Sequence, residues 1–222
     1  MKRLQHIRML SNLGAILCCG IILSSCNVTG PDADVWEDVS TFSWPKQTGV
    51  SMKYRSTGYD PIRETDFTET EVVTVDISEL DGQEMFVLSD PDKLTFQEVY
   101  YLPSKDRLIV KQEEFGEGIA LLAPLEKGHK WYTSQDSSWQ AEIIERFAYR
   151  KVDGKIYQNV VAVRYRMKSN SSIYEPEYIR FYAQGVGDIL TIRNVYPSTN
   201  ATSQPLPQEE ARTELIETIP ES

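Results

Sequence analysis

Cysteine is confined to the first 26 residues of this 222-residue chain, at Cys18, Cys19 and Cys26. The rest of the chain therefore has no thiol for a disulfide, a metal site or a nucleophile. Histidine is almost as scarce, because His6 lies near the start and His129 is the only other one. Zinc sites built from several histidines are excluded, and a Ser-His-Asp triad would depend on His129 alone. The sequence predicts no metal and no cofactor, and it predicts that His129 is an exposed turn residue and not a catalytic base.

Acidic residues are absent before Asp32, whereas Lys2, Arg3 and Arg8 make the start of the chain positive. An apolar run from Leu13 to Leu23 follows, and then small residues. This order is typical of a secretory signal peptide. The apolar run is shorter than the roughly 20 residues that cross a bilayer, so it does not predict a transmembrane helix.

The tetrapeptide Leu23-Ser24-Ser25-Cys26 resembles the lipobox of bacterial lipoproteins, in which an aliphatic residue and two small residues precede a cysteine. The resemblance implies that residues 1–25 are a lipoprotein signal peptide and that the mature chain begins at Cys26, with diacylglycerol on its thiol and an acyl chain such as palmitate on its amine. Several acyl chains hold a protein stably at a membrane, whereas one does so only marginally. Because Asn27 and not Asp follows the cysteine, the resemblance implies the outer membrane of the bacterial envelope. The alternative is an ordinary signal peptide with a coincidental cysteine.

Basic residues are outnumbered in the predicted mature chain. Removing residues 1–25 takes three of the 23 Lys and Arg and leaves 20 against 33 Asp and Glu, a formal net charge of −13. Nucleic-acid binding needs a basic surface, and adhesion to anionic lipid head groups needs Lys and Arg near the membrane. The sequence therefore predicts no nucleic-acid partner, and it predicts membrane attachment through the acyl chains on Cys26.

A convincing helical pattern is missing from residues 41–196, where short runs rich in Val, Ile, Tyr, Phe and Thr alternate with turns. Two runs place apolar residues at every second position, namely Val161, Val163, Tyr165 and Met167 in one and Trp139, Ala141, Ile143, Phe147 and Tyr149 in the other. Such alternation predicts a mostly β protein whose antiparallel sheet, as a half-barrel or a sandwich, has one buried face. A helix over residues 137–152 is the alternative for that stretch.

Two candidate repeats, 41–111 and 119–196, share landmarks in the same order. Pro45, Gly49, Gly82 and Tyr101 of the first correspond to Pro124, Gly128, Gly154 and Tyr182 of the second. Each repeat is predicted to be an antiparallel meander, in which Gly82 and Gly154 supply the positive φ of a two-residue hairpin turn. Chance similarity between common turn residues is the alternative to a duplication.

Because either repeat alone would leave an apolar face in water, one domain is expected over residues 41–196. An acylated tether over 26–40 would precede it, and a polar, disordered tail over 197–222 would follow.

A second resemblance covers residues 120–195. The segments from Pro124 to Tyr132 and from Phe181 to Gly187 are similar to a pattern in β-rich envelope lipoproteins, Pro-Leu-x-x-Gly-x-x-Trp-x-Tyr followed by Tyr-Tyr-Ala-x-Gly-Val-Gly. The resemblance implies a curved sheet of the kind found in lipoprotein-sorting carriers, whose concave apolar face holds lipid, and it implies no catalytic residue.

Structural roles are predicted for the residues of this pattern. Trp131 is expected to anchor the core, whereas the adjacent Tyr132 lies on the opposite face of its strand, and Gly185 and Gly187 are expected in a turn.

The leading functional hypothesis is a non-enzymatic binding or assembly role, through an apolar sheet face or an envelope protein partner, because no catalytic motif is visible. The alternative is a carboxylate-dependent, glycosidase-type hydrolase, which needs two acidic residues at a fixed separation. With 33 acidic residues, some such pair is inevitable. An apolar cavity without converging carboxylates would favour binding, and paired acids in a cleft would favour catalysis.

Overall fold

The computed structural model describes residues 33–60, 63–90, 98–112, 116–134, 137–167, 174–197 and 208–220, so Cys26 and the predicted signal peptide lie outside the described residues. The described residues form two short 3-10 helices, η1 (Ala33–Glu37) and η2 (Val39–Phe42), and twelve strands. The first six strands are β1 (Val50–Asp60), β2 (Thr65–Leu80), β3 (Gln83–Ser89), β4 (Val99–Pro103), β5 (Arg107–Gln112) and β6 (Gly116–Leu122). The last six are β7 (Lys130–Tyr132), β8 (Trp139–Val152), β9 (Lys155–Met167), β10 (Tyr174–Ala183), β11 (Gly187–Pro197) and β12 (Gln208–Ile219).

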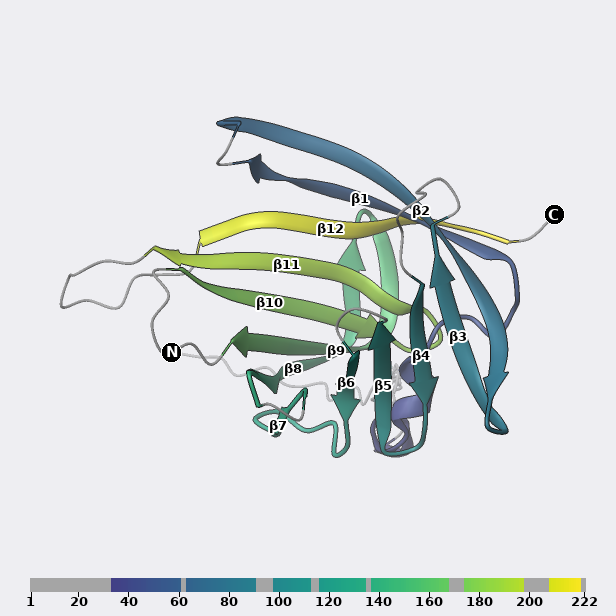
Figure 1. Cartoon of the computed structure of the whole chain (residues 1–222). Coiled ribbons are helices and arrows are strands. Elements are labelled where there is room, and N and C mark those ends of the chain that lie inside the picture. The colour runs from purple at the N-terminus through teal and green to yellow at the C-terminus, as the bar shows by residue number, and fades with distance from the viewer. Residues whose placement is uncertain are drawn as a thin grey trace, which may run out of the picture.

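All twelve strands form one antiparallel sheet in the order β6-β5-β4-β3-β2-β1-β12-β11-β10-β9-β8-β7 (Figure 1). The two edges meet, because Ile119 of β6 donates its backbone N–H to the carbonyl of Thr133 at 2.7 Å. The indole Nε1 of Trp131 in β7 donates to the carbonyl of Ile119 at 3.0 Å. The sheet therefore curves until it nearly closes into a barrel, and the prediction of a mostly β, curved antiparallel sheet is confirmed.

A β-bulge in β8 changes which of its side chains face the barrel interior. Ile143 lies opposite Val163, but the register shifts before Glu145, and Phe147 lies opposite Val160. The prediction that Trp139 to Tyr149 share one face is therefore wrong beyond Ile143, because the extra residue of a bulge reverses the alternation. The alternative of a helix over residues 137–152 is also wrong, since β8 occupies 139–152.

Beyond this bulge the β8–β9 hairpin bends across the outer face of the sheet (Figure 1). The Phe147 ring packs against Phe181 of β10 with ring centroids 6.3 Å apart. At the turn of the hairpin, the Asp153 carboxylate accepts a hydrogen bond from Arg55 of β1 at 2.7 Å. The hairpin thus reaches past β10, β11 and β12 and forms a second layer there.

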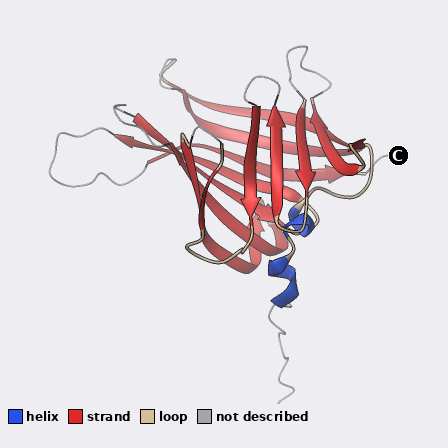
Figure 2. Cartoon of the chain, turned by 60° about the horizontal axis from the view of Figure 1, so that its bottom comes forward, coloured by secondary structure: helices blue, strands red, loops and turns tan. Residues whose placement is uncertain are grey.

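Residues 33–44 cover one end of the barrel (Figure 2). The N–H of Val39 donates to the carbonyl of Lys105 in the β4–β5 turn at 2.9 Å, and Thr41 accepts from the N–H of Gly185 at 2.7 Å. Val39, Phe42 and Trp44 are buried in the core. The predicted domain start at residue 41 is therefore too late, because part of the expected tether fills the end of the barrel.

Residues 208–219 form β12, which lies between β1 and β11, so the prediction of a disordered tail is wrong for them. Leu215 is fully buried, and Glu214 forms an ion pair with Arg55 of β1 at 3.2 Å. The segment was predicted to be a tail because it has few apolar residues. Backbone hydrogen bonds to strands on both sides supply the stabilisation that its composition does not show.

The strand order divides into two halves of six strands each, β1–β6 and β7–β12. In both halves an Asp-Gly turn joins the second and third strands, and both residues of each turn have positive φ: Asp81 52°, Gly82 79°, Asp153 45° and Gly154 82°. The candidate repeats 41–111 and 119–196 each stop before the sixth strand of their half. A duplication stays a prediction.

Candidate functional site

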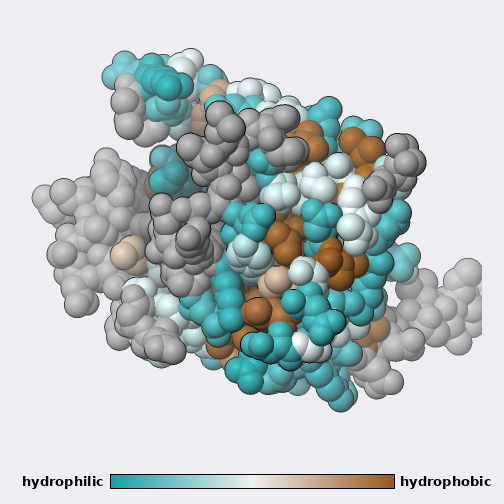
Figure 3. Space-filling model, turned by 45° about the vertical axis from the view of Figure 1, so that its right-hand side comes forward, coloured by the Kyte–Doolittle hydropathy of each residue, from teal (hydrophilic) through white to brown (hydrophobic). Residues whose placement is uncertain are grey.

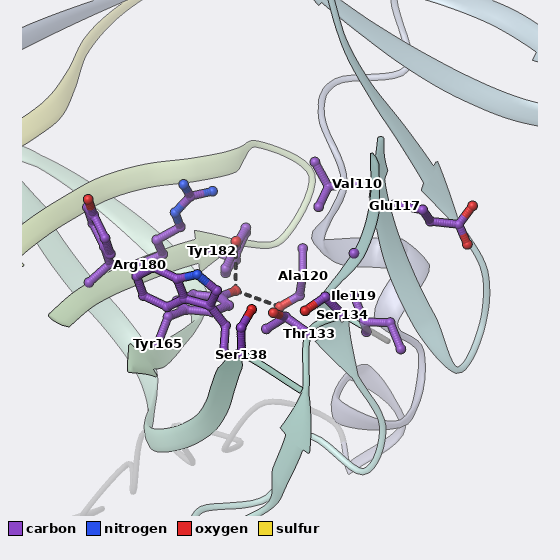
Figure 4. A pocket seen from close by; sticks show the side chains of 13 residues that line it. Val110, Glu117, Ile119, Ala120, Thr133, Ser134, Ser138, Tyr165, Arg180 and Tyr182 are labelled. Carbon is purple, nitrogen blue, oxygen red and sulfur yellow. Dashed lines mark hydrogen bonds between the residues drawn. The ribbon is translucent and has the colours of Figure 1, made fainter. Parts of the chain in front are cut away.

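A cavity of about 450 Å³ lies beside the seam where the sheet nearly closes (Figure 4). Four aromatic side chains form much of its wall: Trp139 from β8, Tyr165 from β9, and Tyr178 and Tyr182 from β10. The Trp139 and Tyr178 rings lie 5.7 Å apart. The volume falls within the range of roughly 300–1,000 Å³ that is usual for small-molecule sites.

Hydrogen bonds fix the direction in which two tyrosine hydroxyls of this wall donate their protons. The Tyr165 hydroxyl donates to the carbonyl of Ala120 at 2.6 Å, and it lies 3.0 Å from the Tyr182 hydroxyl (Figure 4). Because a phenol has only one proton to donate, Tyr182 is the donor between the two hydroxyls. The Tyr182 oxygen also accepts a hydrogen bond from the side chain of Arg180 in β10.

Arg180 lies between Tyr178 and Tyr182 on the interior face of β10 and lines this cavity. It also lines a second cavity of about 270 Å³, whose walls include Trp44, Tyr54, Leu88 and Tyr101. The guanidinium carbon of Arg180 is 5.8 Å from the centre of the Tyr165 ring. Arg180 is thus a cation at the junction of two aromatic-walled cavities.

The acidic group whose charge acts on Arg180 is Asp188, at the start of β11. Its Oδ1 accepts from the N–H of Leu190 at 3.2 Å, and its Oδ2 accepts from the Thr191 hydroxyl at 2.9 Å. Burial raises the pKa of Asp188, and the charge of Arg180 opposes that rise. Burial likewise raises the pKa of Tyr182, so this phenol is neutral at physiological pH.

The larger cavity has one carboxylate among its lining residues, that of Glu117. The smaller cavity is lined by Asp188 and Glu71. Within the described ranges, no group of three or more His, Cys, Asp or Glu side chains could hold a metal ion. The larger cavity therefore offers aromatic surface, hydroxyl groups and one cation, but not the paired acids of a glycosidase.

None of the residues for which the sequence predicted a structural role lines this cavity. Trp131 is buried, with 6% of its surface exposed, and joins β7 to β6, whereas Tyr132 is 45% exposed. Gly185 and Gly187 lie at the β10–β11 turn, and Gly82 and Gly154 lie in hairpin turns. Cys26 lies outside the described residues.

His129 is not the exposed turn residue that the sequence predicted. It is partly buried, and its ring stacks on Trp131 with centroids 5.7 Å apart. Its Nε2 is buried, and within the described part of the chain it has no hydrogen-bond partner.

Sequence reasoning named Trp139 and Tyr165 as strand residues and Tyr182 as a landmark of the second repeat, but it missed Tyr178 and Arg180. The signal was the alternation Tyr178-x-Arg180-x-Tyr182. In a strand with one buried face, an arginine flanked at i−2 and i+2 by tyrosines points into the interior with them.

Figure 3 shows apolar side chains in separate groups between hydrophilic ones on the side of the molecule that carries β3. In the part of the chain that the structure describes, no helix is both long and apolar enough to cross a membrane.

Comparisons with known proteins find fold-level likeness only. No protein-family model and no curated protein matches the sequence. A candidate exported protein with a YmcC-like fold from Bacteroides fragilis is similar with a TM-score of 0.49 and 11% identity, over 80% of this chain and 99% of that one. A candidate lipoprotein from Parabacteroides distasonis is similar with a TM-score of 0.43 and 14% identity, over 82% of this chain and 99% of that one. At these scores and identities, neither similarity says anything about function.

Proposed function

We propose that this protein is a lipid-anchored protein of the bacterial envelope that binds a small, largely apolar molecule inside its barrel without transforming it. The observation that carries the proposal is the cavity of about 450 Å³ walled by Trp139, Tyr165, Tyr178 and Tyr182. Aromatic and aliphatic walls with a few well-placed polar groups are typical of small-molecule binding sites.

The composition of the cavity favours binding over hydrolysis. Glycosidases place two carboxyl groups on either side of the scissile bond, roughly 5–9.5 Å apart. Among the described residues, Glu117 is the one carboxylate that lines the larger cavity. A ligand there would meet rings and hydroxyls but no acid–base pair.

Anchoring is supported by the sequence Leu23-Ser24-Ser25-Cys26. Replacing the thiol that would carry diacylglycerol should release the protein, because an acidic chain is not attracted to anionic head groups and attachment would depend on the acyl chains. We therefore expect Cys26→Ala to move the protein from the outer-membrane fraction to the soluble fraction, with unchanged circular dichroism. A variant that still sediments with membranes would contradict the anchoring.

Binding can be tested with the neutral fluorescent dye N-phenyl-1-naphthylamine, which brightens in apolar sites. The assay uses the full chain with Cys26→Ala, because this variant carries no acyl chains of its own that could compete with the dye. Ser138 lines the cavity, so Ser138→Trp should fill it and abolish saturable dye binding. Ser78→Trp makes the same change at an exposed position of β2 and should leave binding intact. Dye binding that is absent, or equal in both variants, would contradict the proposal.

A further inference from the structure

We propose that the ligand carries an anionic group, a carboxylate or a phosphate, and that Arg180 binds this group at the junction of the two cavities. Arg180 can have this role only if the barrel binds a ligand at all, so the proposal rests on the proposed function and specifies its ligand class. The ligand would be an elongated amphiphile with one apolar chain and one anionic end.

The position of Arg180 follows from the sheet. It lies opposite Val163 of β9 and Thr191 of β11, so strands on both sides hold its backbone. Its side chain shares the interior face with Tyr178 and Tyr182, and it is the residue common to the walls of both cavities. A group that entered either cavity would meet the same guanidinium.

The charge of Arg180 has no direct ion-pair partner among the described residues, although the carboxylates of Asp188 and Glu71 line the smaller cavity with it. Tyr165 donates its proton to Ala120 and Tyr182 donates its proton to Tyr165. The hydrogen-bond partners of Arg180, Tyr101 and Tyr182, are thus neutral phenols and not carboxylates. The Asp188 carboxylate acts on Arg180 through space, but its oxygens accept hydrogen bonds from Leu190 and Thr191. A guanidinium cannot lose its proton in a protein, so this charge persists in the interior.

An enclosed charge is unfavourable unless it is paired and hydrogen-bonded. A carboxylate or a phosphate matches the planar fork of a guanidinium with two parallel hydrogen bonds. Binding of such a group would complete the pairing that the protein itself leaves incomplete. The remainder of the ligand would then lie along the rings of the larger cavity, where Trp139 and Tyr178 present apolar surface.

The test measures displacement of N-phenyl-1-naphthylamine by four molecules with the same twelve-carbon chain: dodecanoate, dodecyl phosphate, dodecanol and dodecyltrimethylammonium. If Arg180 binds the anionic group, at least one anion should bind about tenfold or more tightly than the alcohol, and the cation should bind more weakly than the alcohol. The ratio between the two anions tells whether the ligand is a carboxylate or a phosphate. The chain that carries Cys26→Ala and no other change gives this result, so it does not depend on whether a cavity variant folds.

Three substitutions then assign the preference to Arg180. Arg180→Gln should bring the anions to within about twofold of dodecanol in the same variant, whereas Arg180→Lys should restore part of the preference. Asp188→Asn removes the competing negative charge and should tighten dodecanoate binding roughly threefold or more at a pH where Asp188 is ionised. An increase in affinity cannot come from misfolding.

The outcomes separate the two proposals. If neither the dye nor any twelve-carbon molecule binds, the proposed function fails. If dodecanol and the anions bind equally well to the chain with Cys26→Ala alone, or if Arg180→Gln still prefers the anions, the barrel binds a ligand but Arg180 is not the anion site. Weaker dodecanoate binding in Asp188→Asn would likewise contradict the role of Arg180.

Discussion

Gly187 lies directly against the indole of Trp44, so that a Cβ atom at position 187 would be 2.6 Å from Cε2 of that ring. Gly187 also has a φ of 84°. The start of β11 thus needs glycine for two reasons, a left-handed backbone and a close approach by the residue that closes the barrel end.

We expect Gly187→Ala to lower the free energy of unfolding by more than Gly154→Ala does. Gly154 has nearly the same φ, 82°, but a Cβ atom at position 154 would have no other atom within 4 Å. Gly154→Ala should therefore report the backbone strain alone, about 1–2 kcal/mol. Gly187→Ala should add roughly 1–3 kcal/mol for the overlap with Trp44. Equal losses in urea unfolding would show that Trp44 does not pack against this glycine.

Leu215→Ala tests whether the C-terminal segment is a central strand. Leu215 is fully buried, so its truncation should cost about 2–5 kcal/mol of unfolding free energy. Ile219→Ala, near the end of the same strand at 41% exposure, should change stability by no more than about 0.5 kcal/mol and serves as the control. If both variants melt like the wild type, residues 208–219 are a tail after all.

Trp131 should be required for closing the seam between β7 and β6. Trp131→Ala is expected to destabilise by roughly 3–5 kcal/mol, the range for truncating a buried aromatic side chain. Trp131→Phe keeps most of the ring but leaves the carbonyl of Ile119 without its indole donor, and should lose about 0.5–1.5 kcal/mol. A Phe variant as unstable as the Ala variant would assign the effect to the hydrogen bond and not to packing.

Asp188 should make stability fall as pH rises. Its pKa is raised above the ordinary 3.8, so the folded state holds its proton more strongly than the unfolded state does. The contribution is present at low pH and is lost as the pH rises from about 3.8 through the raised pKa. Asp188→Asn cannot titrate, so its melting temperature minus that of the wild type should increase between acidic and neutral pH. A difference that is constant, or that decreases, would contradict the raised pKa.

Some structural signals are local in the sequence and others are not. Alternation in Val161, Val163 and Tyr165 predicted a strand with one buried face, because the period of a strand is visible in a few residues. The curvature of the sheet was implied by the resemblance to envelope lipoproteins. The bulge after Ile143 was not predictable, since it depends on how β8 pairs with β9. β12 was missed because its stabilisation comes from two neighbouring strands and not from its own apolar content.

The candidate site was only partly predictable for the same reason. Its aromatic residues were visible as strand residues, but the cavity is formed by β6, β8, β9 and β10 together. Arg180 could have been found from its flanking tyrosines.

The most direct test of ligand binding in the barrel is a crystal structure of the full chain carrying Cys26→Ala, grown with 12-bromododecanoic acid. The bromine gives an anomalous signal that locates the chain end independently of the protein atoms. We predict the carboxylate against the guanidinium of Arg180 and the bromine among the rings of Trp139 and Tyr178. A crystal grown at a saturating concentration of the acid in which the cavity is empty, or in which the bromine lies only on the outer surface, would contradict the proposed function.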